Sequence, residues 1–154
     1  MFTIAGLDPA PFQHYIAMSD GELAALHARR VISDGDGQPC RVSLVDAAAG
    51  EELLLVHYMH HAVDTPYRAS GPIYVRRAAT RSVFVDEVPL LLRTRVLSLR
   101  AYDAAGFMRE AAVMPGAELE MHVARMFADA KTVYLHAHYA QPGCFAARID
   151  RRER

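Results

Sequence analysis

Short stretches in which apolar and polar residues alternate, separated by turn sequences, constrain this fold more than any other feature. A period of two is typical of strands with one buried face, and Gly, Pro or Asp between two such stretches indicates a hairpin. We expect hairpins around Ala47–Gly50, Asp103–Gly106 and Pro142–Gly143. The predicted strands are Phe2–Leu7, Cys40–Asp46, Glu51–Met59, Pro72–Arg77, Ser82–Asp86, Arg95–Tyr102, Phe107–Val113, Thr132–Ala140 and Cys144–Asp150.

Two stretches have helical periodicity instead. Ser19 and Glu22 have the spacing of a capping box, which predicts a helix over 19–30, and apolar residues on one face predict a second over 116–129. Because the helices do not alternate regularly with strands, parallel βαβ units are not expected. The sequence predicts an α+β fold as a single domain, 1–154, with a mainly antiparallel and curved sheet, two main amphipathic helices and a solvated tail at 151–154.

Composition excludes several classes of protein. The chain has 154 residues, 52% of them hydrophobic, and a net charge of -1, which argues against nucleic-acid binding. The longest apolar runs, such as Leu53–Val56 and Val88–Leu92, are too short to cross a bilayer. The first residues do not resemble an export signal, so we expect a cytoplasmic protein in which Cys40 and Cys144 are not bonded to each other.

Five of the eight histidines lie in two clusters, at 57–61 and 136–138. His136 and His138 are two residues apart on a predicted strand, so both point to one side of the sheet, as two metal ligands would. If Pro142–Gly143 is a two-residue turn, Cys144 lies on the opposite face, although a register slip of one residue reverses this. With no third ligand placed, we expect no metal and no cofactor, and His136 with His138 stays the weaker, metal-binding alternative.

A thiol beside an imidazole is a second chemical possibility. In a hairpin around Ala47–Gly50, Cys40 would face His57 and could be a nucleophile. Because apolar residues share that face, we favour a core role for Cys40.

The loop predicted at His60–Pro72 is the stronger candidate for a site. It combines Asp64, Arg68 and Ser70 with two prolines, and stiff polar loops at the rim of a sheet often carry binding groups. The alternative is a surface connection in which Asp64 and Arg68 form a local ion pair.

Three stretches together resemble a known family. They are Cys40–Leu44, the pattern from Asp64 through Pro66-Tyr67-Arg68 to Ile73, and the pattern from His136 to Cys144. In these the chain resembles, over nearly its whole length, a bacterial family catalogued as domain of unknown function 1203. The resemblance implies a bacterial, cytoplasmic, single-domain protein, and it implies no reaction, cofactor or catalytic residue.

Two functional hypotheses follow. In the first, the His60–Pro72 loop and the His136–Cys144 hairpin line one concave site that binds a small anionic molecule, with or without catalysis. Arg would hold the anion and a histidine would transfer a proton. In the second, the histidines are structural and the chain is a binding or self-assembly module that associates through a free sheet edge. The candidate ligand-binding residues of the first hypothesis are His60, Asp64, Arg68, Ser70, His136 and His138.

Overall fold

The protein has the predicted α+β fold with antiparallel strand pairing, but its strands form two sheets. The computed structural model describes residues 1–152. A six-stranded sheet has the order β5-β1-β9-β8-β6-β7, and a three-stranded sheet has the order β2-β3-β4. The strands are β1 (Phe2–Ala5), β2 (Arg29–Ile32), β3 (Glu52–His61), β4 (Ala69–Arg76), β5 (Val83–Val85), β6 (Val96–Tyr102), β7 (Met108–Pro115), β8 (Tyr134–Tyr139) and β9 (Phe145–Arg151).

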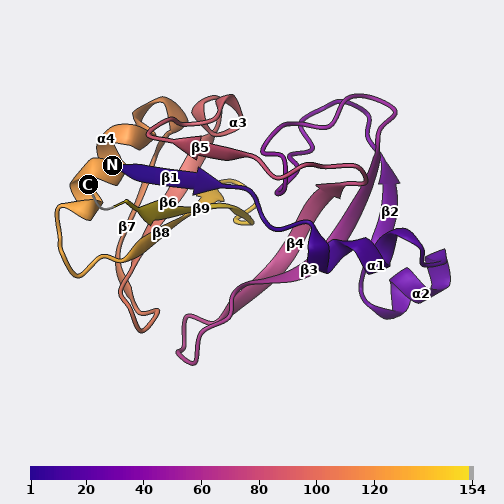
Figure 1. Cartoon of the computed structure of the whole chain (residues 1–154), viewed down its shortest axis with the longest axis horizontal. Helices are drawn as coiled ribbons and strands as arrows, with labels where there is room; N and C mark the ends of the chain where they lie inside the picture. The colour runs from indigo at the N-terminus through magenta and orange to yellow at the C-terminus, as the bar shows by residue number, and fades with distance from the viewer. Residues whose placement is uncertain (153–154) are drawn as a thin grey trace.

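Each sheet packs its own helices and its own core. In Figure 1, α4 (Leu119–Phe127) and α3 (Leu90–Arg93) lie with the six-stranded sheet, and α1 (Gln13–Ile16) and α2 (Asp20–Ala25) lie with the three-stranded sheet. Short 3-10 helices at Ala10–Phe12 and Gly116–Glu118 precede α1 and α4. The first core includes Leu92, Leu99, Leu119, Met126, Leu135 and Ile149, and the second includes Phe12, Leu23, Cys40, Val42, Leu54 and Ile73.

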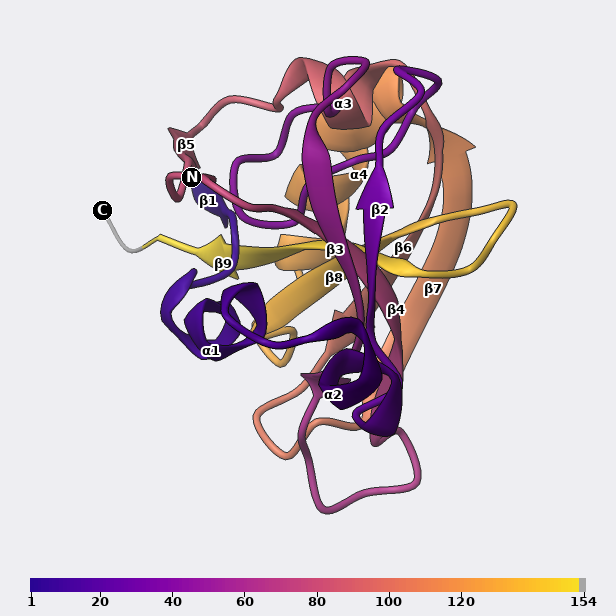
Figure 2. The same ribbon diagram turned by 90° about the vertical axis from the view of Figure 1, so that its right-hand side faces the viewer.

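The two sheets cross each other. In Figure 2, β3 and β2 run in front of β9, roughly across its direction. The contact between the sheets includes the end of β3, where the ring of His60 stacks on that of Phe145 with centroids 5.2 Å apart. Residues from two distant parts of the chain are therefore brought together at this crossing. Within residues 1–152, no helix is long and apolar enough to cross a membrane.

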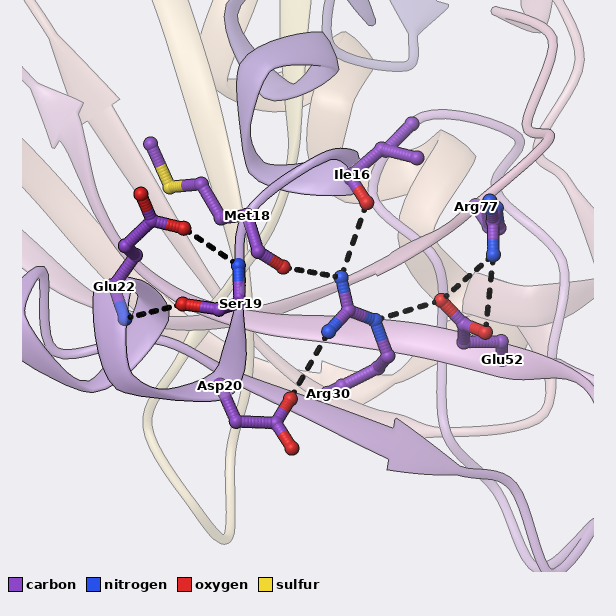
Figure 3. Close-up of polar contacts among 8 residues, drawn as sticks. All are labelled: Ile16, Met18, Ser19, Asp20, Glu22, Arg30, Glu52 and Arg77. Atoms are coloured by element: carbon purple, nitrogen blue, oxygen red, sulfur yellow. Dashed lines mark hydrogen bonds and ion pairs between the residues drawn. The ribbon is translucent and has the colours of Figure 1, made fainter.

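The helix predicted at 116–129 is confirmed, but the one predicted at 19–30 is too long. Ser19 and Glu22 form the expected capping box, which begins α2 (Figure 3). The helix ends at Ala25 because His27 has a φ of 55°, which an α-helix does not accommodate. Arg29 and Arg30 lie in β2 instead of neutralising a helix C-terminus.

The strand predicted at Cys40–Asp46 is wrong. The chain reverses there: Leu44 N–H donates to the carbonyl of Cys40, and Cys40 N–H donates to that of Val45. The apolar residues of this segment are buried on a turn, not on a pleated strand, and Leu44 has a φ of 51°. The hairpin predicted around Ala47–Gly50 therefore does not form, and β3 pairs with β2 and β4.

The other two hairpins form, with one change of register. Asp103–Gly106 joins β6 to β7 as predicted, with Gly106 at a φ of 86°. The turn between β8 and β9 is longer than two residues, since Gly143 N–H donates to the carbonyl of Tyr139. A bulge in this pair places His138 opposite Phe145 and His136 opposite Arg148, whereas the two-residue turn placed them opposite Ala147 and Ile149.

The predicted tail at 151–154 is partly ordered. Arg151 is the last residue of β9, and its guanidinium donates to the carbonyls of Asp129 and Thr132. Residues 153–154 lie outside the described residues.

Candidate functional site

Four histidines from the two predicted stretches meet where β3 crosses β8. His60 and His61 end β3, and His136 and His138 lie on β8. The ring centroids of His60 and His138 are 5.1 Å apart, and those of His61 and His136 are 5.0 Å apart. We call these four residues the histidine cluster.

The two β8 histidines share one face, as their spacing predicted. Leu135, Ala137 and Tyr139 point into the core of the six-stranded sheet, so His136 and His138 point to the opposite side, toward β3. Cys144 packs against that same core and is on the face away from the histidines. It is therefore not a third ligand for a metal at His136 and His138. Among residues 1–152, no group of three or more His, Cys, Asp or Glu side chains is arranged to hold a metal ion.

Hydrogen bonds define the tautomers of two cluster members. His61 Nδ1 lies 2.7 Å from the carbonyl oxygen of Tyr67, and its Nε2 lies 2.6 Å from the Tyr134 hydroxyl. Since a carbonyl only accepts, the Nδ1 of His61 donates, and the Tyr134 hydroxyl donates to Nε2. By the same reasoning, His138 Nδ1 donates to the carbonyl of Gly143 at 2.9 Å. Neutral His138 then has an unprotonated Nε2.

Three cluster nitrogens are buried without a hydrogen-bond partner in the described part of the chain: His60 Nδ1, His136 Nδ1 and His138 Nε2. Burial disfavours the charged imidazole, and His61 adds repulsion to all three, as does Arg100 to His60 and His138 and Arg148 to His136. The pKa is lowered to about 4 in His60 and His138 and to about 2 in His136. These three imidazoles are neutral at neutral pH, so the cluster is unsuited to exchanging protons there.

The remaining predicted residues do not join the cluster. Asp64 and Arg68 lie on the exposed tip of the β3–β4 hairpin, with Arg68 Nη1 3.9 Å from Asp64 Oδ1. Ser70 Oγ lies 2.8 Å from Nε2 of the exposed His57. The six candidates therefore separate into three clustered histidines and three residues on the outer side of the hairpin. Arg68, one of the predicted anion-binding residues, lies away from the His136–Cys144 hairpin, beside Asp64.

The expected pairing of Cys40 with His57 also fails. Cys40 is fully buried in the second core, and its Sγ lies 3.3 Å from the backbone nitrogen of Arg76. Because Cys40 lies on a turn and not on a strand paired with β3, the two side chains do not face each other. This burial fits the core role favoured from the sequence.

A cavity of about 720 Å³ lies at the other end of β8, around Arg41 and Tyr139. Arg95, at the start of β6, and Cys144, just before β9, also line it, and Tyr74 of β4 contributes from the second sheet. The His60–Pro72 stretch contributes no residue to this cavity, so it is not the shared concave site that the sequence suggested.

Arg41 is the unusual residue of this cavity. Arg41 is only 2% exposed. Its guanidinium donates to two backbone carbonyl oxygens, that of Phe145, 2.7 Å from Nε, and that of Pro39. None of the ion pairs within residues 1–152 includes Arg41. Burial lowers the pKa of Arg41, because the charged guanidinium is less stable away from water.

Two guanidinium groups contact the ring of Tyr139. The Cζ atoms of Arg41 and Arg95 are 5.0 and 5.5 Å from its centroid, and Arg95 also pairs with Asp46 at 2.6 Å. Tyr139 is 5% exposed and its hydroxyl has no hydrogen-bond partner within residues 1–152. Burial raises the pKa of this hydroxyl to about 12, so it is a donor at neutral pH.

Reasoning from the sequence missed this cavity because Arg41 was assigned to a strand face. One signal was present: Arg41 is the single charged residue between Gln38 and Val45. Its position depends on Gly6, since a Cβ there would lie 1.8 Å from the carbonyl oxygen of Val42. β1 can therefore pass close to the turn, and Leu7 N–H donates to the carbonyl of Arg41.

Comparison with known proteins gives one match. No curated protein and no solved structure matches the chain. A protein-family model described as a protein of unknown function (DUF1203) matches residues 37–151, which include the Arg41 turn, the cluster and the β8–β9 hairpin.

Proposed function

The chain belongs to the DUF1203 family, whose function is unknown, and we propose that it binds a small anionic molecule in the cavity around Arg41. One observation carries the proposal: a buried guanidinium lines the cavity and has no carboxylate partner in the described residues. A buried charge without a counter-charge costs several kcal/mol, and a bound anion would offset this cost.

The other residues of the cavity suit such a ligand. A guanidinium has five N–H groups, and the two carbonyls leave some of those of Arg41 available. Tyr139, whose buried hydroxyl has no partner in the described residues, also lines the cavity, and Tyr74 and Pro142 supply apolar surface. The volume falls in the range of small-molecule sites. We therefore favour a carboxylate or phosphate on a partly apolar body.

The setting is part of the same proposal. We place the binding in a bacterial cytoplasm, to which two free thiols and the resemblance of the sequence are suited. The net charge of -1 speaks for a small ligand and against nucleic acid or an anionic membrane surface.

Thermal unfolding with matched compounds tests the proposal. Benzoate and phosphate should raise the Tm in a concentration-dependent way, whereas neutral benzamide, in chloride of equal ionic strength, should not. Arg41→Gln should weaken benzoate binding roughly tenfold or more, because hydrogen bonds to charged groups contribute about 1.5–3 kcal/mol. Arg95→Gln is the second variant, because Arg95 is less buried than Arg41 and its replacement should reduce folding stability less.

Arg81→Gln is the matched control. Arg81 also donates from Nε to a backbone carbonyl, that of Gly6 at 2.8 Å, and does not line the cavity. Its benzoate affinity should stay at the wild-type value. The proposal is wrong if no anion stabilises the wild type more than chloride does, or if Arg81→Gln weakens binding as much as the cavity variants.

Self-association is a second candidate, favoured by the outer edge of the six-stranded sheet. β7 is an eight-residue edge strand, and its Val113 is 67% exposed. Such an edge can pair with a second copy of the chain. Light scattering would reveal a dimer that Val113→Lys converts to a monomer; a wild-type monomer at high concentration would exclude it.

A further inference from the structure

Cys144 is the thiol that lines the cavity. It is a free thiol, partly exposed, at the end of the loop that joins β8 to β9, and it lines the cavity together with Arg41. Cys40, the other thiol, is completely buried in the second core. Only one of the two cysteines is therefore open to a molecule bound in the cavity.

Cys144 lies beside a cationic group. Burial lowers the pKa of Arg41, and its contacts with Tyr139 and Cys144 oppose this lowering, which places the guanidinium next to the thiol. The thiolate is the nucleophilic form of cysteine. Reactive cysteines typically lie in such partly exposed, electropositive places.

A second observation points to a ligand beside the thiol. Tyr139 lines the same cavity, is more than nine-tenths buried, and has a hydroxyl without a partner in the described residues. A buried donor left unpaired costs about 1–3 kcal/mol, which an acceptor oxygen of a bound molecule would recover. The cavity thus combines a nucleophile with donors for an anionic group.

We propose that Cys144 forms a mixed disulfide with a small anionic disulfide held by Arg41 and Arg95. The proposal rests on the proposed function, since the same cavity binds the anion. The Cys144 thiol loses its proton to solvent, and its sulfur attacks one sulfur of the disulfide. A new S–S bond forms, the S–S bond of the ligand breaks, and the other half leaves as a thiolate. The disulfide is the oxidant, so no other co-reactant is needed.

Reaction rates with two disulfides of opposite charge test the proposal. The full chain is mixed with dianionic 5,5′-dithiobis(2-nitrobenzoate) or with dicationic cystamine, and the modified cysteine is identified by mass. Cys144 should react faster with the dianion than with the dication. The ratio of these two rates should exceed the same ratio for N-acetylcysteine amide by roughly tenfold or more, since a tenfold effect needs only about 1.4 kcal/mol. Cys144→Ser should abolish the fast reaction, and Arg95→Gln should reduce the preference.

The two proposals fail in different ways. If Cys144 is inert, or reacts without preference for the anion, while benzoate still stabilises the wild type, the thiol proposal is wrong and anion binding stands. If benzoate does not bind and the dianion is not preferred, both proposals are overturned. A fast reaction at Cys40 would also contradict the thiol assignment.

Discussion

Arg41 Nε donates to the carbonyl oxygen of Phe145 at 2.7 Å, joining residues 104 positions apart in the sequence. The ring of the same Phe145 stacks on His60, with an interplanar angle of 12°. Phe145 thus contacts Arg41, which lines the cavity, through its backbone, and the histidine cluster through its side chain. This arrangement allows the two sites to be perturbed separately.

Phe145→Leu should affect the cluster and leave the cavity intact. The leucine retains the carbonyl that accepts from Arg41 but removes the ring that stacks on His60. We expect a loss of about 1–2 kcal/mol in the free energy of unfolding, since the smaller leucine leaves part of the ring's space unfilled and removes an aromatic pair. Benzoate affinity, measured by calorimetry, should stay within about twofold of wild type. A large loss of affinity would show that the two sites are coupled.

The neutral histidine cluster should make the protein sensitive to acid. His60, His136 and His138 have pKa values of about 4, 2 and 4 in the folded chain, against about 6.5 when unfolded. Below pH 6.5 the unfolded state therefore binds more protons, and stability falls as pH decreases. Each of the three imidazoles lowers the free energy of unfolding by about 1.4 kcal/mol per pH unit until its folded pKa is reached.

Denaturant titrations between pH 7.5 and 4.5 measure this dependence. His138→Asn should reduce its slope by about one proton, since one depressed imidazole is removed. A free energy of unfolding that does not change between pH 7 and 5 would contradict the buried, neutral state of the cluster.

Gly6→Ala should destabilise the fold and the cavity together. The added Cβ would lie 1.8 Å from the Val42 carbonyl oxygen, so β1 or the Arg41 turn must move. We expect a loss of about 2–4 kcal/mol and weaker benzoate binding. Gly21→Ala is the matched change: Gly21 lies in α2, a Cβ added there would meet no neighbouring group within 4 Å, and alanine should stabilise the protein by about 0.5–1 kcal/mol. Equal effects of the two substitutions on stability would refute the close-approach argument.

Arg30→Leu should loosen the contact between α2 and the three-stranded sheet. The Arg30 guanidinium pairs with Asp20 and Glu52 and donates to the carbonyls of Ile16 and Met18 (Figure 3). Loss of this half-buried network should cost about 1–3 kcal/mol in denaturant unfolding. Arg29→Leu removes an exposed charge from the same strand and should change stability by less than about 0.5 kcal/mol. A similar cost for both would mean that the network contributes little.

Local patterns predicted local structure well in this chain. The capping box at Ser19 and Glu22, the helix over 116–129 and the hairpin at Asp103–Gly106 all form, because each depends on contacts between near neighbours in sequence. The common face of His136 and His138 also follows from the two-residue period alone. The register of the β8–β9 hairpin was missed because a bulge shifts a strand without leaving a clear pattern.

The α+β class, two of the three predicted antiparallel hairpins and the shared face of His136 and His138 follow from the sequence alone, as does the choice of its two polar stretches as candidate sites. Tertiary structure alone decided that the strands divide into two sheets, that His60 reaches β8 while Arg68 and Ser70 stay outside, and that Arg41 is buried beside Tyr139. The physical reason is the range of the interactions. Turns and caps are stabilised within a few residues, whereas the environment of a charge such as Arg41 is set by groups as distant in sequence as Phe145, and no local pattern encodes that contact.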